Sequence, residues 1–298
     1  MGNRTIILKG EDQMYRLFIA LFLNVFPITN LCFAEYPVRE NETIRKSFSF
    51  LKSDTKNRLE IDNVFGSIEI KGYTGDKIEA TINKTIKAKT KHDIDIAKEE
   101  VTLDFYDNDD SIEFIVNGPF RKADGSINFH GPQRYQVHYD FEIKVPHQTS
   151  LYLSTINDGE IYVNDTIGDF DIKNINGGVE IENINGSGSA YALNKDLIVV
   201  FKENPKESSY FGSLNGDVDI SFQKGFSADC MVKTFNGDIY SDFPIEYLAR
   251  PAGRQENRKG KFVYKSNGYT AVRVGSGGPQ IEFDGFNGDI RINEIHTK

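Results

Sequence analysis

The sequence predicts an all-β protein whose short strands stack into a single-chain β-solenoid with rungs of about 20 residues. Along most of the chain after residue 59, apolar residues alternate with polar ones, which is typical of half-buried strands. A short phrase also recurs at 214–220, 235–240 and 286–292, with a looser copy at 175–181: an apolar residue, then Asn-Gly-Asp, then alternating apolar residues. Because the same turn returns with the same neighbours, successive copies can stack at about 4.8 Å, the spacing between paired strands.

The first 34 residues have the features of a secretory signal peptide. An apolar stretch over 17–34 follows Arg16, and Ala34 is the small residue that a cleavage site requires. Asparagine and proline residues interrupt this stretch, so a transmembrane anchor fits it less well. We therefore expect residues 1–34 to be removed. Met14 opens an ordinary short positive start and is an alternative first residue.

The remaining chain, 35–298, is expected to form one β-solenoid domain that is exported to the periplasm, the cell surface or the medium. The segment 35–58 should cap the first rung, because an uncovered end would present open strand edges. Alternation indicates strands ahead of the clearest repeats, at 59–61, 68–70, 112–116 and 139–145.

One short helix is predicted over 93–100. Ile94, Ala97 and Val101 share one face at helical spacing there.

Three stretches break the strand pattern and are expected to be loop insertions, near 107–134, 202–209 and 242–261. Insertions in a stacked repeat emerge as loops, and such loops often carry the binding function. The last insertion is rich in basic residues, which are candidates for contact with an anionic envelope polymer or a lipid headgroup. A solvated, flexible loop is the alternative interpretation. The candidate polyanion contacts are Arg250, Arg254, Arg258 and Lys259.

The repeated turn is the structural site that the sequence predicts. We expect its asparagine side chains to form a ladder and its glycines to supply a positive φ at the corner. The residues of this turn repeat are Asn157, Gly159, Asn176, Gly178, Asn215, Gly216, Asn236, Gly237, Asn287 and Gly288. The residue before each asparagine is large and apolar, and we expect it to point into the core. These residues are Ile156, Ile175, Leu214, Phe235 and Phe286.

Composition limits the possible partners. The 298 residues include 35 basic and 44 acidic ones, a net charge of −9, which argues against nucleic acid because phosphate binding needs clustered positive charge. Without the leader, Cys230 is the only cysteine, so no intramolecular disulfide can form, and its apolar neighbours predict a core side chain. No later segment approaches membrane length, so we expect no membrane span in the mature chain.

Three longer stretches resemble the bacterial putative-adhesin family of β-strand-repeat proteins, a domain of unknown function. They are 59–73, the run from 139 to 159, and 275–283 before the last Asn-Gly-Asp. The resemblance implies a β-solenoid at the cell envelope. The chain departs from the regular family pattern in the insertion at 242–261 and in a degenerate copy at 184–188.

The residues offer no clear constellation for chemistry. Asp217, Asp238 and Asp289 lie at the repeated turn, where aspartate is favoured for conformational reasons, so we interpret them as structural. A calcium ladder would be the alternative, but the glycine-rich nonapeptide of calcium-binding β-rolls is absent. The five histidines lack the paired spacing of a zinc site, and no serine sits in a Gly-x-Ser-x-Gly elbow. We therefore predict no catalytic residue, no metal and no cofactor.

Aromatic residues in the insertions are candidates for a sugar-binding surface, although packing of the loops is the simpler interpretation. They are Phe120, Phe129, Tyr210, Phe211 and Tyr247.

The function that fits these observations is a secreted, non-enzymatic, adhesin-like protein of the cell envelope that binds an unknown envelope protein or glycan. The alternatives are a polysaccharide-acting enzyme on a β-helical scaffold and a self-assembling envelope stress-response component. The sequence leaves the oligomeric state open.

Overall fold

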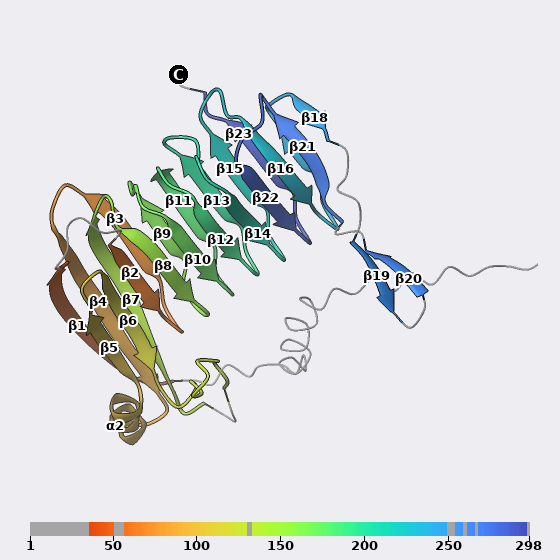
Figure 1. Ribbon diagram of the computed structural model, residues 1–298. Coiled ribbons are helices and arrows are strands. Elements are labelled where there is room, and N and C mark those ends of the chain that lie inside the picture. Colours follow the sequence, from red (N-terminus) through yellow and green to blue (C-terminus); the bar gives the residue numbers. More distant parts are fainter. Residues whose placement is uncertain are drawn as a thin grey trace, which may run out of the picture. The chain divides into compact units, whose positions relative to one another are not determined.

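The protein is all-β, with two large mixed sheets and one short helix among the described residues (Figure 1). The computed structural model describes residues 36–50, 57–129, 133–248, 254–258, 261–265 and 268–296. Nearly all of them belong to one compact unit, which spans 36–250 and 268–298. The second unit contains a two-stranded antiparallel hairpin, β19 (Arg254–Arg258) and β20 (Lys261–Lys265).

The first sheet, sheet A, has ten strands in the order β1-β4-β7-β3-β9-β11-β13-β15-β23-β17. Neighbouring strands are parallel from β7 to β17, whereas the β1–β4 and β4–β7 pairs are antiparallel. The strands are β1 (Val38–Ser49), β3 (Ile68–Tyr73), β4 (Lys77–Ala88), β7 (Tyr135–Pro146), β9 (Ile161–Asn164), β11 (Val179–Ile184), β13 (Leu197–Phe201), β15 (Val218–Phe222), β17 (Ile239–Ser241) and β23 (Ile290–Glu294).

The second sheet, sheet B, has eleven strands in the order β18-β21-β16-β22-β14-β12-β10-β8-β2-β6-β5. Neighbours are parallel from β16 to β6, and the outer pairs at both ends are antiparallel. The strands are β2 (Arg58–Asp62), β5 (Thr102–Asp107), β6 (Ser111–Asn117), β8 (Ser150–Thr155), β10 (Phe170–Asn174), β12 (Gly188–Ala192), β14 (Ser209–Ser213), β16 (Ala228–Lys233), β18 (Ile245–Tyr247), β21 (Thr270–Val274) and β22 (Gln280–Gly285).

Consecutive strands alternate between the two sheets from β8 to β17. We call a sheet B strand together with the sheet A strand that follows it a rung. Rungs β8/β9, β10/β11, β12/β13 and β14/β15 follow one another in the stack in sequence order, which is the arrangement seen in the middle of Figure 1.

At both ends of the stack the rungs leave sequence order. Rung β2/β3 lies between β6/β7 and β8/β9, and rung β22/β23 lies between β14/β15 and β16/β17. The last rung of the chain is therefore covered on both sides, and the end of the stack is built from earlier residues.

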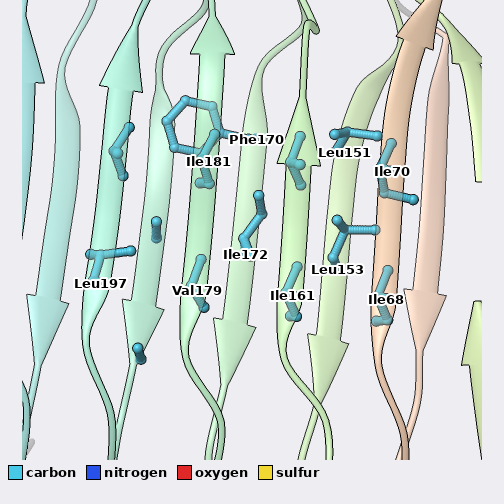
Figure 2. Close-up of a cluster of buried hydrophobic side chains, with 14 of the residues drawn as sticks. Ile68, Ile70, Leu151, Leu153, Ile161, Phe170, Ile172, Val179, Ile181 and Leu197 are labelled. Atoms are coloured by element: carbon cyan, nitrogen blue, oxygen red, sulfur yellow. The ribbon is translucent and has the colours of Figure 1, made fainter. Parts of the chain in front are cut away.

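The core lies between the two sheets and is built by the predicted alternation. Ile68, Ile161, Val179 and Leu197 lie in register on neighbouring strands of sheet A, and all are at most 1% exposed (Figure 2). Leu151, Leu153, Phe170 and Ile172 contribute the matching layer from sheet B. Complete burial of one such side chain stabilises the fold by about 1.5–3 kcal/mol, so the stack gains stability with each rung.

The predicted helix is confirmed as α2 (Lys91–Glu100), which packs against β4 and β7. Thr90 caps it by accepting a hydrogen bond from the backbone N–H of Asp93 at 3.1 Å. Ile94, Ala97 and Val101 are buried, as the spacing predicted.

Other expectations have mixed outcomes. Cys230 is buried in β16, and burial raises the pKa of its thiol to about 12. Strands β6, β18 and β19 fall within the stretches expected to be insertions. The predicted signal peptide, 1–34, lies outside the described residues. No helix in the described part of the chain is long and apolar enough to cross a membrane.

We expect deletion of 280–298 to prevent cooperative folding of the neighbouring rungs. The deletion removes Ile281, Phe283, Ile290 and Ile292, all at most 1% exposed, from a rung that has another rung on each side. At about 1.5–3 kcal/mol each, their loss is comparable to the net stability of a typical domain, about 5–15 kcal/mol. Urea unfolding and amide hydrogen exchange of 209–241 measure the effect, with deletion of 297–298 as the control. Retained cooperative protection of β16 would show that β16/β17 can pair directly with β14/β15, and would contradict the prediction.

Candidate functional site

The asparagines of the repeated turn form one continuous ladder along the stack. Along the stack, each asparagine after the first donates a side-chain hydrogen bond from Nδ2 to Oδ1 of the asparagine before it, over 2.6–2.8 Å. The order along the stack is Asn157, Asn176, Asn194, Asn215, Asn287 and Asn236. Asn194 was not in the predicted set, because its turn, Asn-Lys-Asp, lacks the glycine of the repeat. The ladder follows the order of the rungs and not that of the sequence.

The aspartates of the turn form a second column beside the ladder. Oδ1 of Asp217 accepts the backbone N–H of Asp289 at 2.9 Å, and Oδ1 of Asp289 accepts that of Asp238 at 3.0 Å. Arg291 joins two rungs by contacting Asp217 at 2.5 Å and Asp289 at 2.7 Å. Burial alone would raise the pKa of Asp217, but the hydrogen bonds from Arg291 and Asp289 outweigh it and lower that pKa. These carboxylates therefore hold neighbouring turns together.

The glycines of the turn are required for close stacking, and the predicted positive φ was wrong. None of the predicted turn glycines has a positive φ. Instead, a Cβ at Gly216 would lie 2.2 Å from the carbonyl oxygen of Lys195, and one at Gly288 would lie 2.1 Å from that of Gly216. In the copy at 175–181 the tight position is Gly177, at 1.9 Å from the oxygen of Gly159, while Gly178 has ordinary space.

The expectation that the residue before each asparagine points into the core was also wrong. Phe235 is 71% exposed and Phe286 is 37% exposed, and their rings stack at 5.0 Å and 7°. Ile156, Ile175 and Leu214 are only partly buried. These residues lie at the corner where a strand of sheet B has ended and one of sheet A has not begun. Ile156 still packs against the core, whereas Phe235 and Phe286 are exposed.

The predicted basic cluster is only partly described. Arg250 and Lys259 lie outside the described residues. Arg254 and Arg258 are the first and last residues of β19, whose backbone alone is described.

The aromatic candidates separate into packing residues and exposed residues. Phe211 is fully buried, which agrees with the packing interpretation and excludes it from a sugar-binding surface. Phe120 and Phe129 pack against each other at 5.6 Å, and Phe129 also contacts Phe65 at 5.4 Å. Tyr247 is 72% exposed on the edge strand β18.

Tyr210 lies on the outer face of sheet B beside a shallow hollow open to solvent, with a volume of about 360 Å³. The hollow spans strands β12, β14 and β22, which are neighbours in the sheet (Figure 1). Its lining residues are Gly188, Ser189, Ser208, Ser209, Tyr210, Gln280 and Glu282.

The floor and one wall of the hollow are fixed by hydrogen bonds. The backbone N–H of Gly188 donates to Oγ of Ser209 at 3.2 Å, and Oγ of Ser189 donates to Asp171 at 2.7 Å. A Cβ at Gly188 would lie 1.9 Å from the carbonyl oxygen of Phe170, so the floor needs glycine.

The ring of Tyr210 is supported by a second tyrosine. Tyr191 and Tyr210 stack with centroids 6.4 Å apart at 29°. Both rings reach over Gly212, where a Cβ would lie 2.8 Å from Tyr191 and 2.9 Å from the hydroxyl of Tyr210. Gly212 therefore lets both rings lie flat against the sheet.

The opposite wall of the hollow is also held in place. The hydroxyl of Tyr269 donates to Glu282 and, at 3.0 Å, to Asp284. Lys233 contacts Asp284 at 3.2 Å and lies 5.2 Å from the centre of the Tyr269 ring. Burial and the bond to Glu282 raise the pKa of Tyr269, so its hydroxyl stays protonated and donates.

The sequence contained only one signal for this hollow. Tyr152, Tyr191 and Tyr210 occupy outward positions of the alternating strands, where charged and small polar residues are common. Their arrangement with Glu282 depends on the pairing of β14 with β22, which the sequence pattern does not predict. Among the described residues, no group of three or more His, Cys, Asp or Glu side chains is placed to hold a metal ion.

The fold and this surface define an all-β protein with a long exposed sheet face. No protein-family model and no curated protein matches the chain. Solved structures that the chain is similar to include a putative cell adhesion protein from Clostridium sporogenes ATCC 15579, at 12% identity, with 85% of this chain and 100% of that chain covered and a TM-score of 0.42. A putative adhesin from Bacteroides fragilis NCTC 9343 has 13% identity, coverage of 85% and 97%, and a TM-score of 0.35. A putative lipid binding protein from Parabacteroides distasonis ATCC 8503 has 10% identity, coverage of 85% and 97%, and a TM-score of 0.30.

We expect Asn287→Ala to destabilise the protein about twice as much as Asn236→Ala. Asn287 makes two ladder bonds, whereas Asn236 ends the ladder and makes one. At about 0.5–1.5 kcal/mol per bond, the losses should be about 1–3 and 0.5–1.5 kcal/mol. Urea unfolding measures both, and equal losses would show that the ladder does not contribute bond by bond.

Proposed function

We propose that the protein is an exported, non-enzymatic, adhesin-like binding protein of the bacterial cell envelope. The observation that carries the proposal is the outer face of sheet B, where eight consecutive parallel strands from β16 to β6 form one continuous ladder. Such a face holds outward side chains at fixed spacing, about 4.8 Å from strand to strand. A rigid array of this kind suits recognition of an extended partner.

The architecture that we propose for this platform is a β-solenoid. Strands alternate between the sheets, neighbours in each sheet are mostly parallel, and the turn ladder runs from rung to rung. In a solenoid each rung contacts only its neighbours, so a side chain on the outer face can change without disturbing the core.

The acidic residues support a binding role over a hydrolytic one. The turn carboxylates Asp217 and Asp289 accept backbone N–H groups and contact Arg291, and Glu282 accepts a hydrogen bond from Tyr269. Carboxylates held in this way orient the backbone and neighbouring side chains. A general acid and base would instead need to converge on a substrate.

We expect the purified mature fragment, 35–298, to bind isolated bacterial envelope fractions saturably and without releasing soluble product. Co-sedimentation measures binding, and chromatography of the supernatant measures product release. Release of reducing sugar would indicate that the protein is a polysaccharide-acting enzyme. Absence of saturable binding would contradict the proposed function.

A second candidate function is self-association, and a specific observation favours it. Large exposed apolar side chains gather at the end of the stack formed by β17 and β18. Each of these edge strands pairs with one neighbour, β23 or β21. The members of this apolar end are Phe235, Ile239, Tyr240, Ile245 and Tyr247, with exposures of 40–72%.

The opposite edge of sheet A is charged and not apolar. Its edge strand, β1, carries Arg39, Glu40, Glu42, Arg45 and Lys46, and charges on an edge strand oppose pairing with another chain. With one apolar end and one charged edge, two copies joined through the apolar end would close as a dimer and would not extend into a fibre.

We expect the wild-type protein to dimerise with increasing concentration, and Phe235→Lys with Tyr247→Lys to remain monomeric. Both side chains are more than 70% exposed, so the fold should tolerate the change. Multi-angle light scattering measures the mass, with Tyr106→Lys on β5 as the control. A wild-type protein that stays monomeric, or growth into larger assemblies, would contradict this candidate.

A further inference from the structure

We infer that the hollow beside Tyr210 binds one sugar ring of a neutral glycan. This inference rests on the proposed binding function and assigns it a site and a ligand class. The hollow, at about 360 Å³, falls in the size range of small-ligand sites. It is open to solvent, so neighbouring sugars of a longer chain can continue across the sheet.

The polar groups of the hollow match the hydrogen-bonding pattern of sugar hydroxyls, which both donate and accept. Ser208 donates and accepts, Gln280 offers an amide with both functions, and Glu282 accepts. Ser208 and Gln280 make no side-chain hydrogen bond within the described part of the chain, so both are available to a ligand. Gln280 is exposed at the rim.

Tyr210 provides the apolar surface that a sugar ring needs for its C–H face. Tyrosine combines an apolar ring with a polar hydroxyl, which suits a ligand with the same mixed character. Tyr191 and Gly212 hold the ring in position before any ligand arrives. Such preorganisation reduces the entropy lost on binding.

The charges around the hollow favour a neutral ligand. Glu282 lines it, and Asp171 lies next to Ser189 in the same row of side chains. Two lysines that neighbour these strands are already paired, Lys173 with Asp171 at 3.0 Å and Lys233 with Asp284 at 3.2 Å. An anionic glycan or a phosphate would therefore be repelled by the carboxylates of Glu282 and Asp171, and these two lysines are not free to offset that repulsion.

A second aromatic residue extends the site along the same row. The register places Tyr152, Asp171, Ser189 and Tyr210 opposite one another on consecutive strands. Three strand spacings separate the two tyrosines, about 14 Å. Tyr152 is 39% exposed, and Arg58 lies 5.7 Å from the centre of its ring. A glycan long enough to reach both rings should bind more tightly than a monosaccharide.

The test uses single substitutions in the mature fragment and two probes. The variants are Tyr210→Ala and Gln280→Ala, and Tyr162→Ala on the outer face of sheet A is the matched control. The probes are envelope fractions, with and without periodate oxidation of vicinal diols, and neutral hexasaccharides of glucose, mannose and N-acetylglucosamine. Because the Gln280 side chain is exposed, its variant keeps the test valid even if Tyr210→Ala folds poorly.

We expect wild type and Tyr162→Ala to bind untreated envelope equally, and periodate treatment to abolish binding. Tyr210→Ala and Gln280→Ala should each weaken binding about tenfold or more, and at least one hexasaccharide should compete. A glycan without vicinal diols, such as the interior of a 1,4-linked N-acetylglucosamine chain, survives periodate. Binding that survives periodate and that none of the hexasaccharides competes with would therefore indicate a protein partner and overturn the glycan assignment. Full binding by both site variants would overturn the location while leaving the proposed function intact. No binding by wild type would instead contradict the proposed function itself.

Discussion

The stack depends on the close approach of one turn to the next. At Gly159, Gly216, Gly237 and Gly288 a Cβ would lie within 1.9–2.2 Å of the backbone of the neighbouring turn, much closer than any side chain permits. Glycine at these positions therefore permits the close approach of the rungs, while Lys195 occupies the same column in the turn of Asn194. The asparagine ladder and the aspartate column require the same spacing, because their bonds of 2.6–3.0 Å join residues of successive rungs.

This spacing also defines which residues remain available for function. Inward residues fill the core, and the turn acids are bound to backbone N–H groups and Arg291. The outward positions of the strands remain available, and the register aligns them in rows across each sheet. On sheet B one row brings Tyr210 of β14 beside Ser189 of β12 and Glu282 of β22. The hollow is a direct consequence of this alignment.

The strands and turns follow from the local sequence pattern, but the order in which the rungs stack does not. Alternation predicts strands, and the Asn-Gly phrase predicts a stacked turn, because both arise from neighbouring residues. The order of the rungs does not follow, since Leu214, Phe235 and Phe286 open the same phrase and each copy can stack on any other. For the same reason the sequence marks Tyr210 as a candidate but does not predict the hollow: Glu282 lies opposite Tyr210 only because β22 lies between β14 and β16. Likewise, an apolar residue beside a turn predicts a core position, whereas Phe235 is 71% exposed.

The out-of-order rungs solve a problem that stacked sheets share. A rung at the end of a stack has one bare side, and its backbone groups can pair with another chain. In sheet A, β7 is followed by the antiparallel strands β4 and β1, and the charged side chains of the edge strand β1 oppose further pairing. At the other end β17 receives no such cover within sheet A, and Ile239 is 43% exposed although its neighbour in register, Ile290, is fully buried. The two ends therefore differ. Charged side chains on β1 oppose pairing at one end, whereas at the β17 end Ile239 is partly exposed and could pack against a partner.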